Sequence, residues 1–487
     1  MSRLVIAGAY LVDPDLPLAR ADLLIEGDRI AAIGTGLAGP GDRIVRADGR
    51  FVMPGLINAH THSGHTLARG LVDNLPLDLW MVYVSYGSGL SSPREAYVSA
   101  ALGALELLRT GTTSLIDHAP RVLPDDFDAQ ANAVMTAYRD VGIRAAVAPL
   151  YSDVDYYQTL PFHLLPDLGE RPSLGRSLST PDELLTALHR FLDRWTGQHP
   201  RLSCLLGPSA PERCTRDLLT GSVELARRYG IGLHSHLLEA KFQRMTFEHA
   251  GQSTVEFLVR IGLAGPDSSF AHGVWLDERE IGLLAETGVT VVHNPISNLK
   301  LGSGIAPLQA MLAAGLNVAL GGDGAAANDS QNMFEVMKQT ALLHKLYGLP
   351  ERWPSAEVVL RLCLQGGARV LARPVGSLRP GHLADLIILN RRTLFDAPKE
   401  QLLNQIVYGE LGHSVEAVLV GGQIVIEGGR AALVDEAALY AEANEMARSL
   451  YADISCRRAF AGQTEPLLRR LHAAILTAPL PFERRLS

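Results

Sequence analysis

The sequence has little of what marks secreted, membrane-spanning or cysteine-based metal proteins. Its 487 residues include four cysteines, and no two of them form a C-x-x-C pair. We therefore expect neither a disulfide framework nor a cysteine zinc site, and we predict a reducing, cytoplasmic location. The apolar run at the N-terminus is too short for a signal peptide and ends at Asp13. No stretch of about 18 apolar residues occurs, so no membrane segment is expected.

The sequence also has no excess of positively charged residues. The net charge is -8, and no basic stripe stands out in the chain. Nucleic acid is therefore not the expected partner. Hydrophobic residues make up 47% and charged residues 20% of the chain, which favours a large folded core over disorder. The length exceeds that of one ordinary domain but suits an α/β barrel with additions.

Both ends of the chain carry short apolar runs that alternate with polar residues and are separated by Gly, Asp and Pro. This pattern is typical of β-strands and turns, as in ADLLIEGDRIAAIG near the N-terminus and HSVEAVLVGGQIVIEGG near the other end. We predict that residues 1–53 and 376–431 together form one small β-sandwich domain. Residues 432–487 have a helical pattern and are predicted to be a C-terminal helical extension.

The long middle of the chain alternates short apolar runs with amphipathic helical patterns. The candidate strands are GLINAH (55–60), TTSLID (112–117), IRAAVAPLY (143–151), LSCLLGP (202–208), IGLHSH (231–236), SSFAH (268–272), VTVVH (289–293) and NVALGGD (317–323). Eight strands that alternate with helices pair in parallel through right-handed crossovers and can close into a barrel. We therefore predict an α/β fold in which residues 54–375 form a (β/α)₈ TIM barrel. The Pro-, Gly- and Ser-rich segment 160–180 is predicted to be a loop inserted over the barrel mouth.

The strongest chemical signal is His60-Thr61-His62 at the end of the first candidate strand. Residues two apart on a strand point to the same side, so both imidazoles can face one metal ion. The fifth strand ends at His236, and Glu239 follows three residues later. A histidine at a strand end with a nearby carboxylate can supply a metal ligand and a proton shuttle. Taken alone, each of these patterns could also come from polar residues at a strand-to-loop junction that bind no metal.

Two more polar residues end strands of the same predicted barrel. His272 closes the sixth strand, and Asp323 follows the eighth strand directly before Gly and Ala residues. A buried carboxylate is costly without a partner, which a metal ion or a cationic substrate would supply. All five groups lie at the carboxyl ends of strands, where the active sites of such barrels are built.

The segments that carry these residues resemble the amidohydrolase superfamily, and within it the aminohydrolase branch that deaminates nucleobases, nucleosides and related heterocycles. PGLINAHTHSGHTLARGLVDNLPLDLW is similar to the first-strand motif of the methylthioadenosine and S-adenosylhomocysteine deaminases. HNPISNLKLGSGIAPLQAML and GGDGAAANDSQNMFEVMK resemble the seventh- and eighth-strand motifs of the same group. Triazine hydrolases share much of this pattern.

The resemblance implies one divalent metal ion. Its ligands would be His60, His62, His236 and Asp323. Glu239 would be the proton shuttle, His272 would contact the substrate at the reacting centre, and Asp323 would also orient the attacking hydroxide. The fourth strand offers no lysine for a bridging carboxylate, so a mononuclear site is expected. Three imidazoles and one carboxylate suit Zn²⁺ or Fe²⁺, and we predict zinc.

Further residues near the strand ends are predicted to bind substrate. They are His65 and Trp80 after the first motif, His118 after the second strand, and His293 at the end of the seventh. His234 shares a side with His236 but lies deeper, so we expect it behind the metal ligands. Glu106 lies on an amphipathic helix and is predicted to face solvent.

Together these residues predict a metal-dependent aminohydrolase. It would deaminate an amino-substituted nitrogen heterocycle of the purine, pyrimidine, pterin or triazine type by attack of metal-bound hydroxide, releasing ammonia. The loop MVYVSYGSGLSS lacks the acidic residue that reads ribose hydroxyls in adenosyl-specific members, and IRAAVAPLYSD lacks the arginines expected for an amino-acid carboxylate. A compact heterocycle without a sugar is therefore favoured over S-adenosylhomocysteine.

Two alternatives keep the same fold. The site could displace chloride or an alkylamine from an s-triazine, or open a cyclic amide, with similar chemistry at the metal. A remote alternative is a non-catalytic binding protein. The expected partners are a small heterocyclic substrate and water, with neither nucleic acid nor membrane. The Leu- and Ala-rich tail favours a homodimer or a larger homo-oligomer.

Overall fold

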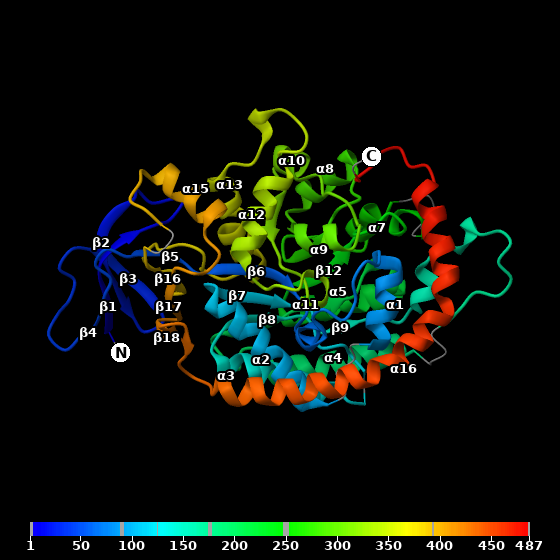
Figure 1. Ribbon diagram of the computed structural model, residues 1–487, viewed down its shortest axis with the longest axis horizontal. Helices are drawn as coiled ribbons and strands as arrows, with labels where there is room; N and C mark the ends of the chain where they lie inside the picture. Colours follow the sequence, from blue (N-terminus) through cyan, green and yellow to red (C-terminus); the bar gives the residue numbers. More distant parts are fainter. Residues whose placement is uncertain are drawn as a thin grey trace.

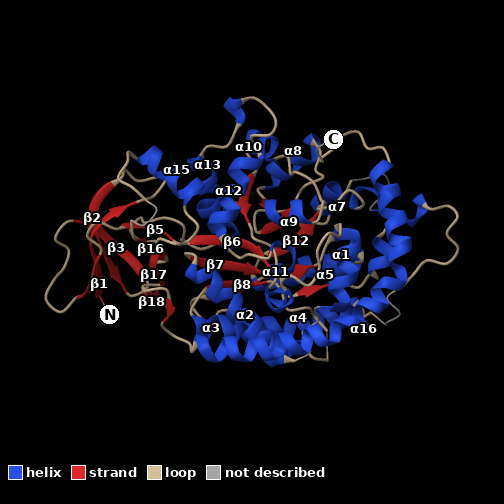
Figure 2. Cartoon of the chain, viewed as in Figure 1, coloured by secondary structure: helices blue, strands red, loops and turns tan. Residues whose placement is uncertain are grey.

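The computed structural model describes residues 3–87, 92–123, 125–173, 178–246, 253–391 and 394–485. A β-rich part contains the N-terminus, a set of parallel strands and helices fills the middle, and one long helix from the C-terminal region runs along the outside (Figure 1). Figure 2 shows the central strands in red, enclosed by helices in blue.

The β-rich part is one sheet built from both ends of the chain. Its strands are β1 (Arg3–Leu11), β2 (Ala19–Glu26), β3 (Arg29–Gly34), β4 (Arg43–Arg46), β5 (Phe51–Pro54), β16 (Leu386–Leu389), β17 (Val415–Val420), β18 (Gln423–Glu427) and β19 (Arg430–Ala431). Their hydrogen-bonded order is β19-β18-β17-β16-β5-β1-β2-β3, and β4 pairs with β1. β5 joins the two halves, because it pairs in parallel with β1 and antiparallel with β16.

This sheet curls until its two halves meet. The N–H of Ile30 in β3 donates to the carbonyl of His382 at 2.9 Å, and the N–H of Ala384 donates to the carbonyl of Asp28 at 2.8 Å. Apolar side chains from both halves, including Ile6 and Leu386, pack in one buried cluster between them. Alternating apolar residues on strands from opposite chain ends thus share a core that neither end could bury alone.

The middle of the chain contains two four-stranded parallel sheets. The first has the order β10-β8-β7-β6 and the second β12-β13-β14-β15, and the short pair β9 and β11 continues β8 and β10. The bounds are β6 (Leu56–Thr61), β7 (Thr112–Asp117), β8 (Arg144–Val147), β9 (Leu150–Tyr151), β10 (Leu202–Cys204), β11 (Gly207–Pro208), β12 (Leu233–Leu237), β13 (Ser268–His272), β14 (Thr290–His293) and β15 (Asn317–Leu320). Each predicted strand segment overlaps at least one of these strands, and the segments 143–151 and 202–208 each contain two.

Hydrogen bonds at both junctions close the two sheets into a barrel. Between β10 and β12, the N–H of Leu206 donates to Gly232 at 3.1 Å and the N–H of His234 donates to Leu206 at 2.8 Å. On the other side, the N–H of Asp323 after β15 donates to the carbonyl of His60 in β6 at 2.9 Å. The predicted (β/α)₈ TIM barrel is confirmed. The seam at which it closes lies between His60 in β6 and Asp323 after β15.

Helices cover the outside of the barrel. They are α2 (Pro93–Arg109), α3 (Phe127–Val141), α4 (Pro181–Trp195), α5 (Arg216–Tyr229), α7 (Thr254–Arg260), α8 (Glu278–Thr287), α10 (Leu308–Ala313), α12 (Met333–Leu343), α13 (Ala356–Arg361) and α14 (Gly367–Leu371). α2, α4, α7 and α8 each begin with a capping box, in which a Ser, Thr or Asp side chain and a Glu three residues later satisfy the free N–H groups. At the end of α3, Gly142 has a φ of 90°, which lets the chain turn into β8.

Shorter elements lie at the barrel mouth and beside the β-sheet. α1 (Leu77–Gly87), α6 (Gln243–Thr246), α9 (Pro295–Lys300) and α11 (Ala325–Asn328) follow barrel strands, and α15 (Lys399–Gly409) lies near the β-sheet (Figure 1). The 3₁₀ turn Tyr156–Thr159 precedes the predicted insert, and the 3₁₀ turn Phe162–Leu164 lies within it. Phe162 packs in an apolar cluster with Trp80 of α1. Residues 174–177 of the predicted insert lie outside the described residues.

The C-terminal region is dominated by α16 (Glu436–Thr477), a helix of 42 residues. It passes α2 and α1 along one side of the barrel (Figure 1). Its residues Leu468, Leu471 and Ile475 are buried in the same apolar cluster as Trp80. In the part of the chain that the structure describes, no helix is both long and apolar enough to cross a membrane.

Candidate active site

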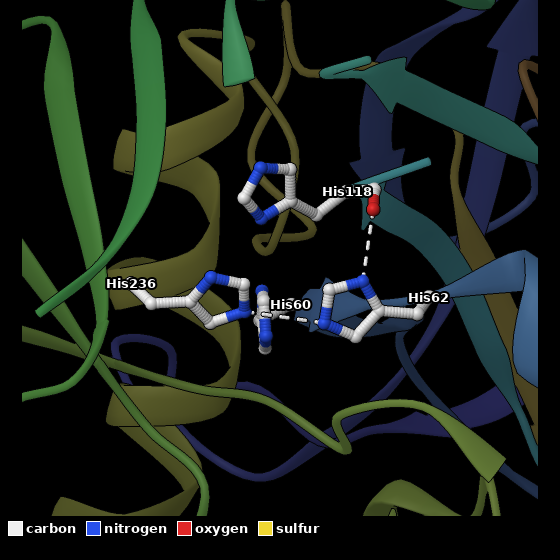
Figure 3. A group of neighbouring side chains, drawn as sticks. All are labelled: His60, His62, His118 and His236. Atoms are coloured by element: carbon white, nitrogen blue, oxygen red, sulfur yellow. Dashed lines mark hydrogen bonds between the residues drawn. The ribbon is translucent and has the colours of Figure 1, made fainter. Parts of the chain in front are cut away.

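Four predicted ligand residues come together at the carboxyl ends of the barrel strands. His62 Nε2 lies 3.2 Å from His236 Nε2 and 3.5 Å from Asp323 Oδ1. His60 Nε2 lies 3.6 Å from the same oxygen of Asp323. The rings of His60, His62 and His236 converge in Figure 3. The side chains therefore come from β6, β12 and the segment after β15, although they are far apart in sequence.

The other ring nitrogen of each histidine is already held by the protein. His62 Nδ1 lies 2.8 Å from the carbonyl of His118, and His236 Nδ1 lies 2.5 Å from the carbonyl of Ser209. A carbonyl only accepts, so both rings carry their proton on Nδ1 and leave Nε2 with a free lone pair. This is the tautomer in which Nε2 can bind a metal ion.

Behind His60 lies a further imidazole, that of His234. His60 Nδ1 is 2.7 Å from His234 Nε2, and His234 Nδ1 is 2.7 Å from Ser269 Oγ. The chain of contacts lets His60 donate to His234 and His234 donate to Ser269, which again leaves His60 Nε2 as the free atom. His234 thus lies behind the candidate ligands, where the sequence led us to expect it.

The chemistry of these groups fits a divalent cation. His60 Nε2 is buried without a hydrogen-bond partner among the described residues. Burial and the neighbouring imidazoles lower the pKa of His60 and of His236 well below 6.5, so both rings are neutral at pH 7. Burial opposes ionisation of Asp323, but the nearby imidazoles and the N–H of Gly324 outweigh it and lower the pKa of this carboxyl. Neutral imidazoles around one carboxylate are a typical donor set for a divalent metal.

The ligand atoms form two overlapping sets. His60, His62, His118 and His236 place their nitrogens within 4.8 Å of one another, and so do the donor atoms of His60, His272 and Asp323. His118 lies over the other rings in Figure 3, and its Nε2 is 3.0 Å from the carbonyl of Gly207. Its Nδ1 is buried without a hydrogen-bond partner in the described part of the chain.

Glu239 and His272 lie beside the ligand cluster. His272 Nε2 is 3.7 Å from Glu239 Oε2, and His272 Nδ1 is 2.8 Å from Asn298 Oδ1. Burial, followed by the nearby carboxylates of Asp323 and Glu212, raises the pKa of Glu239 well above 4.5. A raised pKa makes a carboxylate a better proton acceptor, which is the property that a general base needs.

The cluster opens into a cavity of about 300 Å³. His62, His236, Glu239, His272 and Asp323 line its inner end. Its walls carry the predicted residues His65, Trp80 and His118, the apolar residues Leu77, Met81, Val84 and Leu301, and the polar residues Arg121, Gln130, Glu212, Arg213 and Gln243. An apolar pocket with a few polar groups beside a ligand cluster is the usual form of a small-molecule site.

Comparison with protein families decides the assignment. The amidohydrolase family profile matches residues 51–425. The chain belongs to the amidohydrolase family.

Relatives of this amidohydrolase include deaminases. It is 36% identical over 428 residues to a 5-methylthioadenosine/S-adenosylhomocysteine deaminase of Thermococcus sibiricus. The match covers 88% of this chain and 94% of that relative. It is 34% identical over 461 residues to a 5'-deoxyadenosine deaminase of Methanosarcina mazei, covering 93% and 100% of the two chains.

Solved structures show the same architecture. A zinc-bound adenosine deaminase from Xanthomonas campestris has a TM-score of 0.80 and 28% identity, and the match covers 93% of this amidohydrolase and 99% of that chain. A zinc complex of the atrazine chlorohydrolase from Arthrobacter aurescens has a TM-score of 0.78 and 25% identity, with 91% and 100% covered. This amidohydrolase is therefore a metal-dependent hydrolase that deaminates a nitrogen heterocycle by acting on a carbon–nitrogen bond.

Two predictions about single residues differ from the structure of the amidohydrolase. His293 does not line the cavity, because its Nε2 lies 3.0 Å from Nε2 of the buried His344 at the end of α12. Glu106 is only partly exposed, because it forms an ion pair with Arg69 and accepts from the N–H of Gln331 at 3.0 Å. Neither partner could be found from periodicity, since both are distant in sequence.

The sequence analysis missed the polar wall of the cavity. Glu212 accepts from Gln243 Nε2 at 2.6 Å, and its carboxyl is buried, which raises its pKa. The guanidinium of Arg213 lies 5.3 Å from the ring of Tyr156. The only available signal was the position of Glu212 and Arg213 just after the fourth strand, where loops of such barrels carry active-site residues.

Proposed function

We propose that this amidohydrolase removes the exocyclic amino group of a 6-aminopurine nucleoside of the 5'-deoxyadenosine type, with one zinc ion. The proposal rests chiefly on the convergence of His60, His62, His236 and Asp323 beside a cavity that Glu239 and His272 line. The adenosine-type substrates in the names of the relatives support the choice of nucleoside. The zinc in two similar solved structures supports the choice of metal.

His60, His62, His236 and Asp323 would hold the ion, since their donor atoms face one another. When bound, a divalent metal would lower the pKa of a coordinated water toward about 7 and so supply a nucleophile at neutral pH. The protein contributes the orientation of its ligands through the carbonyls of His118 and Ser209 and through His234.

Glu239 would move the proton. Its buried carboxyl has a raised pKa, so it can accept a proton from the attacking water and deliver it to the departing nitrogen. His272 Nε2 lies 3.7 Å from Glu239 Oε2, so His272 would contact the substrate at the reacting centre. Ammonia and the corresponding lactam would be the products.

The walls of the cavity would hold the purine and the sugar. Trp80, Leu77 and Val84 offer apolar surface to a flat ring, while His65 and His118 lie near the metal ligands. Glu212 supports a substrate with hydroxyl groups, because a carboxylate can accept from them. It would supply, from the segment after β11, the acidic group that the sequence lacks in the loop at 81–92.

Ammonia release from a panel of substrates tests this function. The panel contains 5'-deoxyadenosine, methylthioadenosine, S-adenosylhomocysteine, adenine, guanine, a pterin and a chloro-s-triazine, and metal content is measured in parallel. We expect kcat/KM of at least about 10⁴ M⁻¹s⁻¹ for a small adenine nucleoside and one zinc per chain. Faster turnover of the sugar-free heterocycles would contradict the nucleoside assignment, and chloride release from the triazine would favour the chlorohydrolase alternative.

A cytoplasmic location and a homo-oligomeric assembly are further parts of this proposal. They rest on the scarcity of cysteine and on the composition of the C-terminal region. Gel filtration of the purified enzyme measures the assembly directly.

A further inference from the structure

One buried amide bridges the seam at which the barrel closes. Gln331 follows α11, and 2% of its surface is exposed. Its Nε2 donates to the carbonyl of Asp323 at 2.8 Å, and its Oε1 accepts from Thr61 Oγ1 at 2.8 Å. The side chain of Gln331 thus contacts both sides of the seam. On one side it contacts Asp323, a proposed metal ligand. On the other side it contacts Thr61, which lies between the proposed ligands His60 and His62 in the sequence.

The hydroxyl of Thr61 lies between two acceptors of the same network. Its Oγ1 is 2.8 Å from Gln331 Oε1 and 3.0 Å from the carbonyl of Asp323, and its one hydrogen can go to only one of them at a time. Asp323 has a φ of 57°, in the left-handed region that residues with a side chain rarely adopt. Such a conformation persists only where the surroundings hold it, and here Gln331 Nε2 donates to its carbonyl at 2.8 Å with the hydroxyl of Thr61 close by.

The main chain of Gln331 is also held by a neighbouring side chain. The N–H of Gln331 donates to Glu106 Oε1 at 3.0 Å, and the other oxygen of Glu106 forms an ion pair with Arg69. Asn58 belongs to the same network. Its Oδ1 accepts from the N–H of Gly322 at 2.8 Å, and its Nδ2 lies 3.4 Å from Gln331 Oε1. These contacts fix the position of Gln331 beside the seam.

We propose that Gln331 is a positioning residue that sets Asp323 against His60 and His62 and thereby determines the affinity of the site for its metal ion. It touches neither substrate nor metal and acts through the main chain of Asp323 and the side chain of Thr61. This inference rests on the metal ligands of the proposed function. Hydrogen bonds behind metal ligands typically change metal affinity by about 10–100-fold when they are removed.

The test compares Gln331→Met with the matched control Gln309→Met in the full-length enzyme. Gln309 also donates twice to main-chain carbonyls, those of His344 and Tyr347, at 3.0 and 3.2 Å, but it lies outside the cavity lining. Zinc affinity is measured by competition with a chelator, and the visible spectrum of the Co²⁺-substituted protein reports the ligand geometry. We expect Gln331→Met to weaken zinc binding about 10–100-fold and to alter the Co²⁺ spectrum, while Gln309→Met changes neither.

Equal zinc affinity and identical Co²⁺ spectra in the two variants would overturn the proposal. If Gln331→Met does not fold, Thr61→Val serves instead, since it removes the hydroxyl that lies within hydrogen-bond distance of both Gln331 Oε1 and the Asp323 carbonyl and nearly keeps the volume of the side chain. It should weaken zinc binding to a smaller degree, and an unchanged affinity would again overturn the proposal. Failure of the wild-type protein to bind zinc would instead contradict the metal site itself, so the two failures are distinguishable.

Discussion

At the scale of single residues, the arrangement of protons explains why these histidines suit a metal ion. Each of His60, His62 and His236 has its Nδ1 occupied by another protein group, so that Nε2 faces the common centre. The lowered pKa of His60 and His236 keeps these rings neutral even in mildly acidic solution. Metal binding at this site therefore requires little reorganisation of the protein.

Replacing the proposed proton shuttle should separate chemistry from metal binding. Glu239→Gln keeps the size of the side chain but cannot take a proton from water. We expect kcat to fall by about 10²–10⁴-fold with zinc content unchanged. Steady-state kinetics with metal analysis on the same sample measures both, and a variant with near-native kcat would remove Glu239 from this role.

The two overlapping ligand sets make opposite predictions for two substitutions. If Asp323 completes the set, Asp323→Ala should lose most of its zinc and His118→Asn should keep it. A set of four imidazoles would give the reverse result. Zinc per chain after dialysis, measured by atomic absorption, decides between them, and we expect the first outcome because a carboxylate offsets the charge of the ion.

The sequence could predict the residues of the site that sit at strand ends, and few others. His60, His62, His236, His272 and Asp323 follow recognisable apolar strands, and the structure brings them together. Gln331 and Glu212 carry no such signal, because their neighbours are formed only by tertiary packing. His293 has the same signal as the others, and its pairing with His344 could not be read from it.

At the scale of elements, the C-terminal tail reaches the loop that carries Glu239. Lys241 is buried, and its Nζ donates to the carbonyl of Leu476 at 3.1 Å and lies 3.5 Å from Glu483 Oε2. The carbonyl of Arg484 accepts from the N–H of Ile305 at 2.6 Å. The end of α16 and the segment after it are thus attached to the same side of the barrel as the catalytic loop.

Removing this attachment should affect turnover more than metal binding. Lys241→Met deletes the ammonium that joins the loop to the tail, so we expect kcat to fall several-fold and the free energy of unfolding to fall by about 1–3 kcal/mol. Lys345→Met, which removes a 2.9 Å bond to Tyr408 far from the cavity, is the control. Equal kcat in the two variants, with zinc content as in the wild type, would show that the tail does not influence the loop.

Strand positions were predictable from sequence, while their lengths were not. TTSLID and SSFAH coincide with β7 and β13. The segment IRAAVAPLY, in contrast, is divided into β8 and β9, and Pro149 between them has no N–H to continue the ladder. The domain boundaries at 53/54, 375/376 and 431/432 stay predictions.

At the scale of the whole molecule, a buried ion pair joins the barrel to the β-sheet. Arg144 of β8 donates from Nε and Nη2 to the two carboxylate oxygens of Asp385 at 2.6 and 2.9 Å. Their side chains are 4% and 1% exposed. Asp385 also accepts from the N–H of Gly421 at 2.7 Å, so one carboxylate contacts both parts of the fold.

Breaking this pair should destabilise the protein far more than breaking a surface pair. Arg144→Met leaves a buried carboxylate without its cation, and we expect a loss of about 3–5 kcal/mol in the free energy of unfolding. The exposed pair Arg190 and Asp128 provides the control, in which Arg190→Met should cost about 1 kcal/mol or less. Urea unfolding followed by circular dichroism measures both, and similar losses would mean that Arg144 contributes no more than a surface charge.

The sheet built from both chain ends also affects how the protein is made. β5 and β16 are neighbours in the sheet, yet one ends at Pro54 and the other begins at Leu386. At about 5–20 residues per second, a ribosome needs roughly 15 to 70 seconds to synthesise the chain between them. During that interval the apolar edge of β5 has no partner and is open to aggregation or to chaperones. Nascent chains truncated before Leu386 should therefore be protease-sensitive at the N-terminus, even where the barrel has already formed.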